Sequence, residues 1–432
     1  MQKKIINMKK SLIVFLSTLF ILFGFKVNSQ VEYDNYFTDN QLRIDYYLFG
    51  NADTVSYALD KLVKEPKWGG PRTQLVDGMN YGMYFFEVMP HESYEVIYSH
   101  GYCLLFGEWQ TSDEAKKISK GFHESVVMPF PKDTVDVVFY AKNDNLELIE
   151  QMKITINPND YFISPAPQLP YAIYNVYGDY PVEKAVDIVL LPDGYTEQEM
   201  GKFVQDCQFF VNSLFSYDPY NRYQDRFNIR AVMVPSQDSD ITMPGDGLYR
   251  NTALSCSFWT FDSERYCMTY DNETMKTLAG QVPYDQIYIL ANTKKYGGGG
   301  IFNSYCVSTT GNSYSSDVII HEFGHGFAGL ADEYAYEGTD NYKLDVEPWE
   351  PNITTLVNFE NKWKNMLNKK TPVPTPENDK NIYTIGVYEG AGYQLHGIYR
   401  PMMDCLMNTF NGRKFCPVCE RAIEKMIKHY TE

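Results

Sequence analysis

Two histidines and a glutamate in the run HEFGH have the spacing of a catalytic zinc site. His321 and His325 are four residues apart, and Glu322 lies between them. On a helix, side chains four residues apart point to the same side, one turn apart. Two neutral imidazole nitrogens at this spacing can bind one Zn²⁺, and the carboxylate between them can take a proton from a water that the zinc activates. The pattern therefore predicts a zinc hydrolase with His321 and His325 as ligands and Glu322 as general base.

A catalytic zinc site needs a third protein ligand, and several residues downstream are candidates. Gly329 can end the helix in a left-handed conformation, which lets the chain turn back toward the metal. Asp332 follows three residues later and is the third ligand that we expect, with Glu333 as its nearest rival. Prolines disfavour a ligand on a later helix, where the candidates and prolines are Glu347, Pro348, Glu350 and Pro351. The remaining histidines show no ligand spacing: His91, His100, His123, His396 and His429.

The helix that carries the motif has a recognisable start and two unusual residues. Ser315 or Ser316 is expected to cap its first turn. Gly324 and Gly326 each cost up to about 1 kcal/mol relative to alanine inside a helix. They indicate either the close approach of a neighbouring strand or substrate, or two tolerated weaknesses, and the sequence does not separate these explanations.

The N-terminus and the composition describe an exported, acidic, globular protein. Residues 1–29 read as a cleavable signal peptide, because a basic stretch precedes an apolar run that is short for a membrane span. We therefore expect a secreted, periplasmic or cell-surface protein without a stable membrane span in the mature chain. With 44% hydrophobic residues and a net charge of −17, the chain can fill large cores and is a poor partner for nucleic acid. The composition does not indicate an oligomeric state.

The pattern along the chain predicts two domains. Short alternating runs in residues 31–160 read as strands at 42–50, 83–90, 94–100, 102–109, 133–142 and 149–156. Six or more such strands indicate an N-terminal antiparallel β-sandwich. In residues 161–432, strands at 186–195, 227–236 and 286–292 alternate with a helix at 197–215, which indicates an α/β domain. The expected class is thus α+β with a catalytic C-terminal domain.

A glycine run and a set of cysteines are two further motifs in the sequence. The four glycines at 297–300 lack the GK[ST] of a phosphate loop, so we expect a flexible turn before an edge strand at 301–309 that could pair with an extended substrate. Among the eight cysteines, Cys256 could pair with Cys267, and Cys405 with Cys416 or Cys419. The CPVC motif at 416–419 could be a redox or second zinc site, but no second CxxC accompanies it, so a structural clip is favoured.

Several motifs together resemble known peptidase families. HEFGHGFAGLAD is similar to the metzincin pattern HExxHxxGxxH/D with one additional residue before Gly329, and Met407 in CLMN fits the metzincin Met-turn. The set VLLPDGYT, HEFGHGFAGLADEY, CLMN and FCPVCE closely resembles the bacterial IgA-peptidase family of zinc metalloendopeptidases. The resemblance covers nearly all of the mature chain. Thr409 stands where some metzincins have a tyrosine, so the oxyanion-stabilising group is not indicated.

This resemblance implies a fold, a cofactor and a class of substrate. It implies an N-terminal β-sandwich before a metzincin-like domain, with Zn²⁺ bound by His321, His325 and Asp332 and Glu322 as general base. The substrates would be proteins or glycoproteins, with host immunoglobulin-like proteins among the candidates. The rival interpretation is an inactive or zinc-stabilised surface protein or adhesin that recognises glycoproteins. The intact HExxH disfavours that reading, since a structural zinc does not need Glu322 and usually has a fourth protein ligand.

Overall fold

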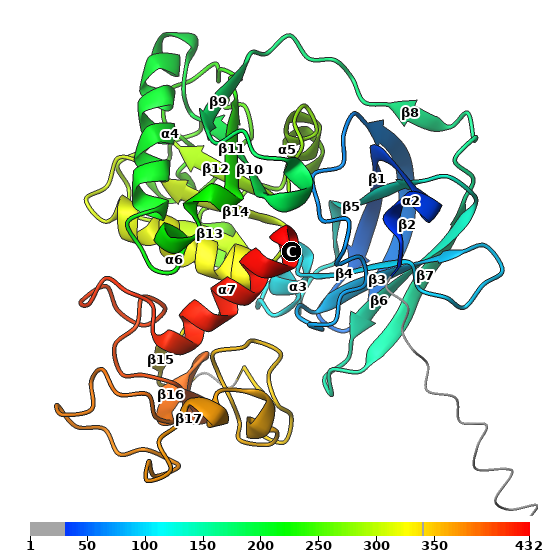
Figure 1. Cartoon of the computed structure of the whole chain (residues 1–432). Helices are drawn as coiled ribbons and strands as arrows, with labels where there is room; N and C mark the ends of the chain where they lie inside the picture. The colour runs from blue at the N-terminus through cyan, green and yellow to red at the C-terminus, as the bar shows by residue number, and fades with distance from the viewer. Residues whose placement is uncertain (1–30, 339–340) are drawn as a thin grey trace, which may run out of the picture. The chain divides into compact units, whose positions relative to one another are not determined.

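The computed structural model describes residues 31–338 and 341–432, so the expected signal peptide lies outside the described residues. Helices and four β-sheets occur together, which agrees with the expected α+β class (Figure 1). Residues 33–432 form one compact unit by their contacts. The expected domain boundary near residue 160 therefore stays a prediction.

The first eight strands form two four-stranded sheets. One sheet has the order β5-β1-β2-β8 and consists of β1 (Phe37–Gly50), β2 (Val55–Glu65), β5 (Lys120–Pro131) and β8 (Ile163–Pro165). The other has the order β4-β3-β6-β7 and consists of β3 (Tyr84–Pro90), β4 (Tyr98–Tyr102), β6 (Val135–Lys142) and β7 (Leu148–Ile156). All pairs except β2·β8 are antiparallel.

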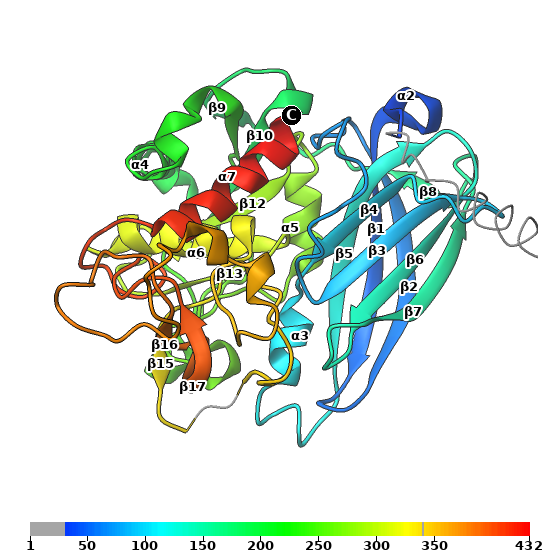
Figure 2. The ribbon, with the colours of Figure 1, turned by 60° about the horizontal axis from the view of Figure 1, so that its bottom comes forward.

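The two sheets lie face to face (Figure 2), and aromatic side chains pack between them. The ring of Tyr46 on β1 lies 5.2 Å from that of Phe139 on β6, and its hydroxyl lies 3.1 Å from the hydroxyl of Tyr102 on β4. Buried side chains of β1, β3, β4 and β6 thus fill the space between the sheets, as expected of a β-sandwich.

The predicted strand over residues 102–109 is wrong. Strand β4 ends at Tyr102, and helix α3 (Leu105–Gln110) follows. Leu105, Phe106 and Trp109 are buried from one side of this helix. A short apolar run does not distinguish a buried strand from a buried helix, so the sequence alone could not decide between them. Strands β2 and β5 are additional to those predicted.

A six-stranded mixed sheet forms the centre of the remaining chain. Its order is β13-β14-β12-β10-β11-β9. The strands are β9 (Ile173–Tyr177), β10 (Val186–Asp193), β11 (Phe227–Val232), β12 (Gln286–Ala291), β13 (Gly298–Ile301) and β14 (Tyr305–Thr309). The inner pairs are parallel, and β9 and β13 are antiparallel edges. Every residue of β10 is buried, which explains its continuous apolar sequence.

The glycine stretch is itself the edge strand, so the predicted turn before an edge strand at 301–309 is wrong. Residues 298–301 form β13, and β14 lies inside the sheet between β13 and β12. The outer side of β13 is paired at Gly298, whose N–H donates to the Arg265 carbonyl (3.2 Å) and whose carbonyl accepts from Cys267 (3.2 Å). This edge is therefore less open to an added substrate strand than the sequence suggests.

Helices cover the two faces of the central sheet (Figure 1). The other α-helices are α2 (Tyr33–Tyr36), α4 (Met200–Leu214), α5 (Asn272–Ala279), α6 (Ser315–Ala328) and α7 (Pro417–Thr431). Side chains of α4, α6 and α7 share one hydrophobic core with the sheet. Helix α5 contacts both β10 and β5, so it lies between the central sheet and the two-sheet region. Short 3₁₀ turns are η1 (Val182–Lys184), η2 (Glu197–Glu199), η3 (Tyr220–Arg222), η4 (Gln224–Arg226), η5 (Pro244–Asp246), η6 (Thr260–Asp262), η7 (Phe359–Asn361) and η8 (Lys364–Met366).

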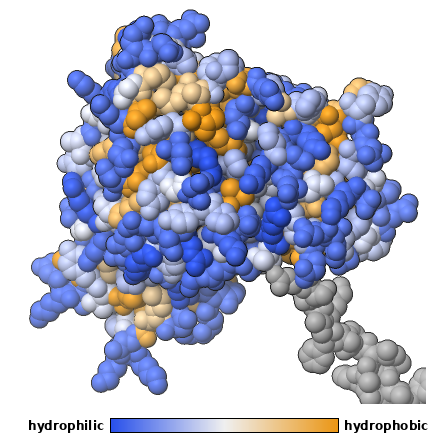
Figure 3. Space-filling view, turned by 45° about the horizontal axis from the view of Figure 1, so that its top comes forward, coloured by the Kyte–Doolittle hydropathy of each residue, from blue (hydrophilic) through white to orange (hydrophobic). Residues whose placement is uncertain are grey.

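The segment after α6 is mostly irregular and carries a small sheet. This sheet has the order β15-β17-β16 and consists of β15 (Ala335–Tyr336), β16 (Tyr388–Ala391) and β17 (Tyr393–Arg400). Within residues 31–338 and 341–432, no helix is both long and apolar enough to cross a membrane. The face in Figure 3 is mostly hydrophilic, with hydrophobic side chains in small patches.

Candidate metal centre

Helix α6 positions the HExxH motif and ends as the sequence predicts. Its C-cap Gly329 has φ 61° and ψ 31°, so the predicted left-handed end is confirmed. The predicted serine N-cap is wrong by one residue, because the N-cap is Tyr314 and no side chain caps the turn. The Ser315 hydroxyl instead accepts a hydrogen bond from the N–H of Asn312 (3.1 Å). The chain leaves α6 at Gly329 and turns back toward the two histidines.

His321, His325 and Asp332 come together at this turn. The Nε2 atoms of the two histidines lie 3.1 Å apart. Oδ1 of Asp332 lies 3.1 Å from Nε2 of His321 and 3.4 Å from Nε2 of His325. Three donors bound tetrahedrally to one Zn²⁺ at its usual N and O distances would be about 3.3 Å apart. The three separations thus match those of ligands of a single small cation.

Hydrogen bonds orient these donors toward a common point. Nδ1 of His321 lies 3.0 Å from the Leu406 carbonyl, and Nδ1 of His325 lies 2.6 Å from the Leu330 carbonyl. Each Nδ1–H therefore donates to the backbone and leaves the Nε2 lone pair for a metal. Oδ2 of Asp332 accepts from the Tyr393 hydroxyl, whereas its buried Oδ1 has no hydrogen-bond donor among the described residues. A cation between the three side chains would satisfy that oxygen, so the residues fit a metal.

The charged groups of this cluster shift one another's pKa values. Burial lowers the pKa of His325, but the charges of Asp332 and Glu322 and hydrogen bonds to Asp332 and Leu330 together outweigh burial and raise this pKa to about 9. Burial raises the pKa of Asp332, but the charges and hydrogen bonds of the two histidines together outweigh burial and hold this pKa well below its ordinary value. Burial also raises the pKa of Glu322. A raised pKa brings a carboxylate closer to that of an effective general base.

Close packing explains the glycines of α6 and of β13. A Cβ on Gly326 would lie 2.2 Å from Sγ of Cys306 on β14, and one on Gly324 would lie 2.9 Å from Sδ of Met407. The close approach of a neighbouring strand is therefore confirmed for Gly326, whereas Gly324 makes room for the Met407 side chain of the CLMN segment. A Cβ on Gly300 would lie 2.3 Å from the Glu322 carbonyl, so the glycine strand can run directly beside the motif. Met407 thus packs beneath the helix that carries the histidines.

The other candidate ligands lie elsewhere. Glu333 points away from the histidines, and its Oε1 lies 3.0 Å from Nδ2 of Asn352 and 3.1 Å from Sγ of Cys419. Glu350 accepts from the Tyr342 hydroxyl (3.0 Å), and Glu347 lies 3.9 Å from Nζ of Lys362. His396 is largely exposed beside Glu389.

Sequence reasoning missed several residues that complete the site. Tyr393 and the carbonyls of Leu330 and Leu406 contact the three donors, and no spacing rule links them to the HExxH motif. The ring of Phe410 lies 5.9 Å from that of His321. Phe410 also lines a cavity of about 360 Å³, together with Tyr296, Asn312, Ser313 and Tyr314. An aromatic recess therefore lies next to His321.

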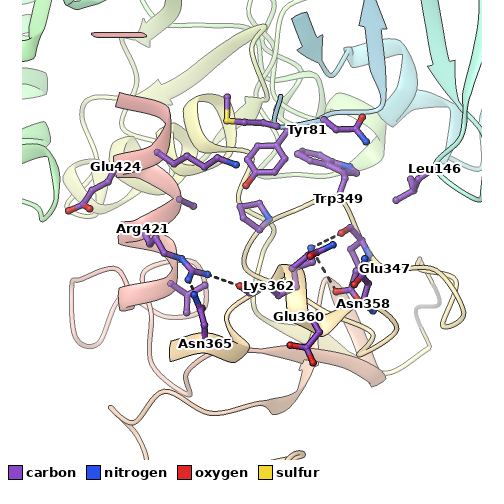
Figure 4. Close-up of a pocket in the computed structure, with 18 of the residues that line it drawn as sticks. Tyr81, Leu146, Glu347, Trp349, Asn358, Glu360, Lys362, Asn365, Arg421 and Glu424 are labelled. Atoms are coloured by element: carbon purple, nitrogen blue, oxygen red, sulfur yellow. Dashed lines mark hydrogen bonds and ion pairs between the residues drawn. The ribbon is translucent and has the colours of Figure 1, made fainter. Parts of the chain in front are cut away.

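A larger cavity of about 740 Å³ lies away from this cluster (Figure 4). Tyr81 and Trp349 form one side of it, and Arg421 of α7 reaches toward the 3₁₀ region around Lys362 and Asn365. Its lining includes neither histidine of the motif, nor Glu322, nor Asp332. The Arg421 guanidinium in this cavity donates to Asn365 Oδ1 and to the Lys362 carbonyl (both 2.9 Å).

Comparison with protein families assigns both parts of the chain. A family model described as IgA Peptidase M64 matches residues 177–385 and 377–427, which include the three clustered donors. A second model, described as Peptidase M64 N-terminus, matches residues 32–153, the region of the two packed sheets. No curated protein matches the chain.

Proposed function

This chain belongs to the IgA peptidase M64 family, which is a family of metallopeptidases, and on that premise we propose that it is a zinc-dependent endopeptidase. The observation that carries the proposal is the set of three donor atoms at 3.1–3.4 Å from one another, beside Glu322. We further propose that residues 161–432 form a metzincin-like catalytic domain behind an N-terminal sandwich domain of residues 31–160.

Zinc is the cation that this donor set favours. Two imidazoles and one carboxylate form a three-ligand set typical of catalytic zinc, which leaves a position for water. When bound, Zn²⁺ supplies a Lewis acid that polarises the scissile carbonyl and lowers the pKa of water to roughly 7. His321, His325 and Asp332 would hold it, and Met407 would support the helix from below.

The chain's own residues perform the proton transfers and the positioning. Glu322 accepts a proton from the attacking water and passes it to the leaving amine. The backbone carbonyls of Leu330 and Leu406 hold the imidazole orientation, and the Tyr393 hydroxyl holds Asp332 through the oxygen that faces away from the histidines. The aromatic recess lined by Tyr296, Tyr314 and Phe410 is suited to one apolar side chain of the substrate.

The proposed function also includes a substrate class and a location. We propose exported action on proteins or glycoproteins, with host immunoglobulin-like proteins among the candidates. The family description supports peptide substrates, and the signal-like pattern of residues 1–29 supports export.

The test compares Glu322→Ala with the wild type on mixed glycoprotein substrates. The variant should keep its zinc and lose at least about 100-fold in cleavage rate, because the general base is removed while the ligands stay. Cleavage is measured by mass spectrometry of the new termini, and zinc by elemental analysis. Glu360→Ala, an exposed carboxylate, is the matched control and should cleave normally.

Two results would contradict the proposal. Normal turnover by Glu322→Ala would reject the assigned general base. A wild type that binds zinc yet shows no cleavage inhibited by a chelator would favour the zinc-stabilised binding protein.

A further inference from the structure

A second cluster of metal-binding side chains lies close behind the first. Glu333, Cys405, Cys416 and Cys419 each offer one donor atom, and these four atoms lie within 4.8 Å of one another. All four residues are at most 1% exposed. We propose that this cluster binds a second divalent cation, a structural Zn²⁺, through three thiolates and one carboxylate.

The sulfur separations fit a shared cation better than a covalent bond. Sγ of Cys405 lies 3.8 Å from Sγ of Cys419. Two thiolates bound tetrahedrally to one zinc at the usual Zn–S distance are also about 3.8 Å apart. All eight cysteines are free thiols in the structure, so the predicted clip between Cys405 and the CPVC motif is not formed.

One oxygen of the buried Glu333 carboxyl group lacks a hydrogen-bond partner among the described residues. This oxygen is Oε2, and Glu333 is fully buried. Its Oε1 accepts from Asn352, which fixes the side chain next to the thiol of Cys419. An isolated buried carboxylate is costly unless it is paired or coordinates a metal.

The local backbone favours thiolates at the two CPVC cysteines. Cys416 is the N-cap of helix α7, with Pro417 in the first turn, and its sulfur accepts from the N–H of Cys419 (3.5 Å). The N–H of Cys416 in turn donates to Sγ of Cys405 (3.3 Å). N–H donors and a helix N-terminus stabilise negative charge on sulfur.

The burial of the three cysteines favours a structural cation over the other known roles of a CxxC motif. A redox pair needs a sulfur that a partner can reach, whereas these sulfurs are buried in the main core. A disulfide between any two of the three cysteines would leave one buried thiol and the Glu333 carboxyl without a charge partner. Four protein donors instead close the coordination sphere, as structural zinc sites do.

Such a cation would fix the loops that build the first site. Glu333 directly follows Asp332, and its N–H donates to the Met407 carbonyl (2.8 Å). Cys405 directly precedes Leu406, whose carbonyl orients His321. The four donors come from the turn after α6, the CLMN segment and α7, so one ion would hold all three segments in place.

The test uses Co²⁺ as a spectroscopic substitute in the full chain. Thiolate ligands give cobalt a strong sulfur-to-metal charge-transfer band in the near ultraviolet, whereas the site of two histidines and one aspartate has no sulfur donor. The band should appear in the wild type and in His325→Ala, and it should be lost in Cys416→Ala. Zinc content should be about two ions per chain in the wild type and about one in each variant. Cys207→Ala, a buried cysteine of α4, is the control and should keep both ions.

Alternative results are distinguishable from one another and from failure of the proposed peptidase activity. A wild type without the band, or an intact mass lowered by the hydrogens lost in a disulfide, would overturn the second site. If Cys416→Ala does not fold, Glu333→Gln keeps the volume and all three sulfurs, and it should release one zinc to a chelator at least about 10-fold more readily than the wild type. Unchanged retention in Glu333→Gln would also overturn the proposal. A wild type with the band but without cleavage would reject only the peptidase.

Discussion

At the residue scale, the adjacent carboxylates of Asp332 and Glu333 point to different clusters of donor atoms. The backbone carbonyls of Asp332 and Tyr334 accept hydrogen bonds from the N–H groups of Gly392 and Tyr393 (2.8 and 2.9 Å), in an extended segment that leads into β15. Successive side chains of such a segment point to opposite sides. Asp332 therefore faces the two histidines while Glu333 faces the cysteines. The sequence could identify both acids as candidates, but only the direction of the turn after Gly329 separates them.

Asp332→Ala should remove the first metal site without unfolding α6. The loss of a direct ligand should weaken zinc binding there by more than about 100-fold, because changes to supporting partners alone cost about 10- to 100-fold. Chelator competition on the purified protein measures this affinity. Tyr393→Phe is the matched control, since it keeps the carboxylate and removes only the hydroxyl that contacts Oδ2. Equal affinity in Asp332→Ala and the wild type would move the third ligand to another residue.

At the scale of elements, locally encoded features were predictable. The apolar run of β10, the helical spacing of α4 and the left-handed end of α6 each depend on residues within one segment. Features set by packing were not. Residues 105–110 form helix α3 and the glycine stretch forms a strand, and neither is set by the local sequence alone. The two explanations for Gly324 and Gly326 likewise needed the positions of Met407 and Cys306.

The cluster of Glu333, Cys405, Cys416 and Cys419 could likewise not be predicted from the sequence alone. CPVC supplies two donors at a recognisable spacing, but Cys405 and Glu333 come from separate segments. Glutamate is also too common in this acidic chain to signal a ligand. The sequence motif thus identifies two of the four donors, and the fold brings the other two next to them.

Strand β5 carries a buried acid that should make stability depend on pH. Glu124 is 5% exposed, and burial raises its pKa to about 8, despite a backbone hydrogen bond from Phe106 and the charge of Lys276, which lower it. Between about pH 4.5 and pH 8 the folded chain binds more protons at this group than the unfolded chain, so stability falls as pH rises. Glu124→Gln should remove this part of the decline and leave stability at pH 4 unchanged.

Denaturant unfolding at several pH values checks the Glu124 prediction. Glu150→Gln, on the exposed part of β7, is the control for the loss of one negative charge. A variant whose gain in stability is the same at pH 4 and pH 8 would show that Glu124 is not the titrating group.

At the scale of the whole molecule, the two-sheet region and the central sheet are joined by buried charges. Arg43 of β1 is 2% exposed and contacts Asp45 and Glu65 at 2.9 Å each, and its guanidinium also donates to Oγ1 of Thr277 on α5 (3.3 Å). A Cβ on Gly280, at the end of α5, would lie 2.4 Å from the Glu65 carboxylate. This network bridges the regions that the sequence predicts as separate domains, and it lies inside one compact unit.

Arg43→Ala should therefore destabilise the whole unit rather than one part of it. The substitution leaves two buried carboxylates without their cation, which costs roughly 3–5 kcal/mol when one partner of a buried pair is removed. Because α5 shares the network, calorimetry should show one unfolding transition that moves to lower temperature as a single peak. Lys116→Ala, which breaks an exposed pair with Asp113, should shift it by about 1 kcal/mol or less. Two separate peaks in Arg43→Ala would instead mean that the sandwich unfolds independently of the rest of the chain. The domain boundary expected near residue 160 would then separate two units that unfold at different temperatures.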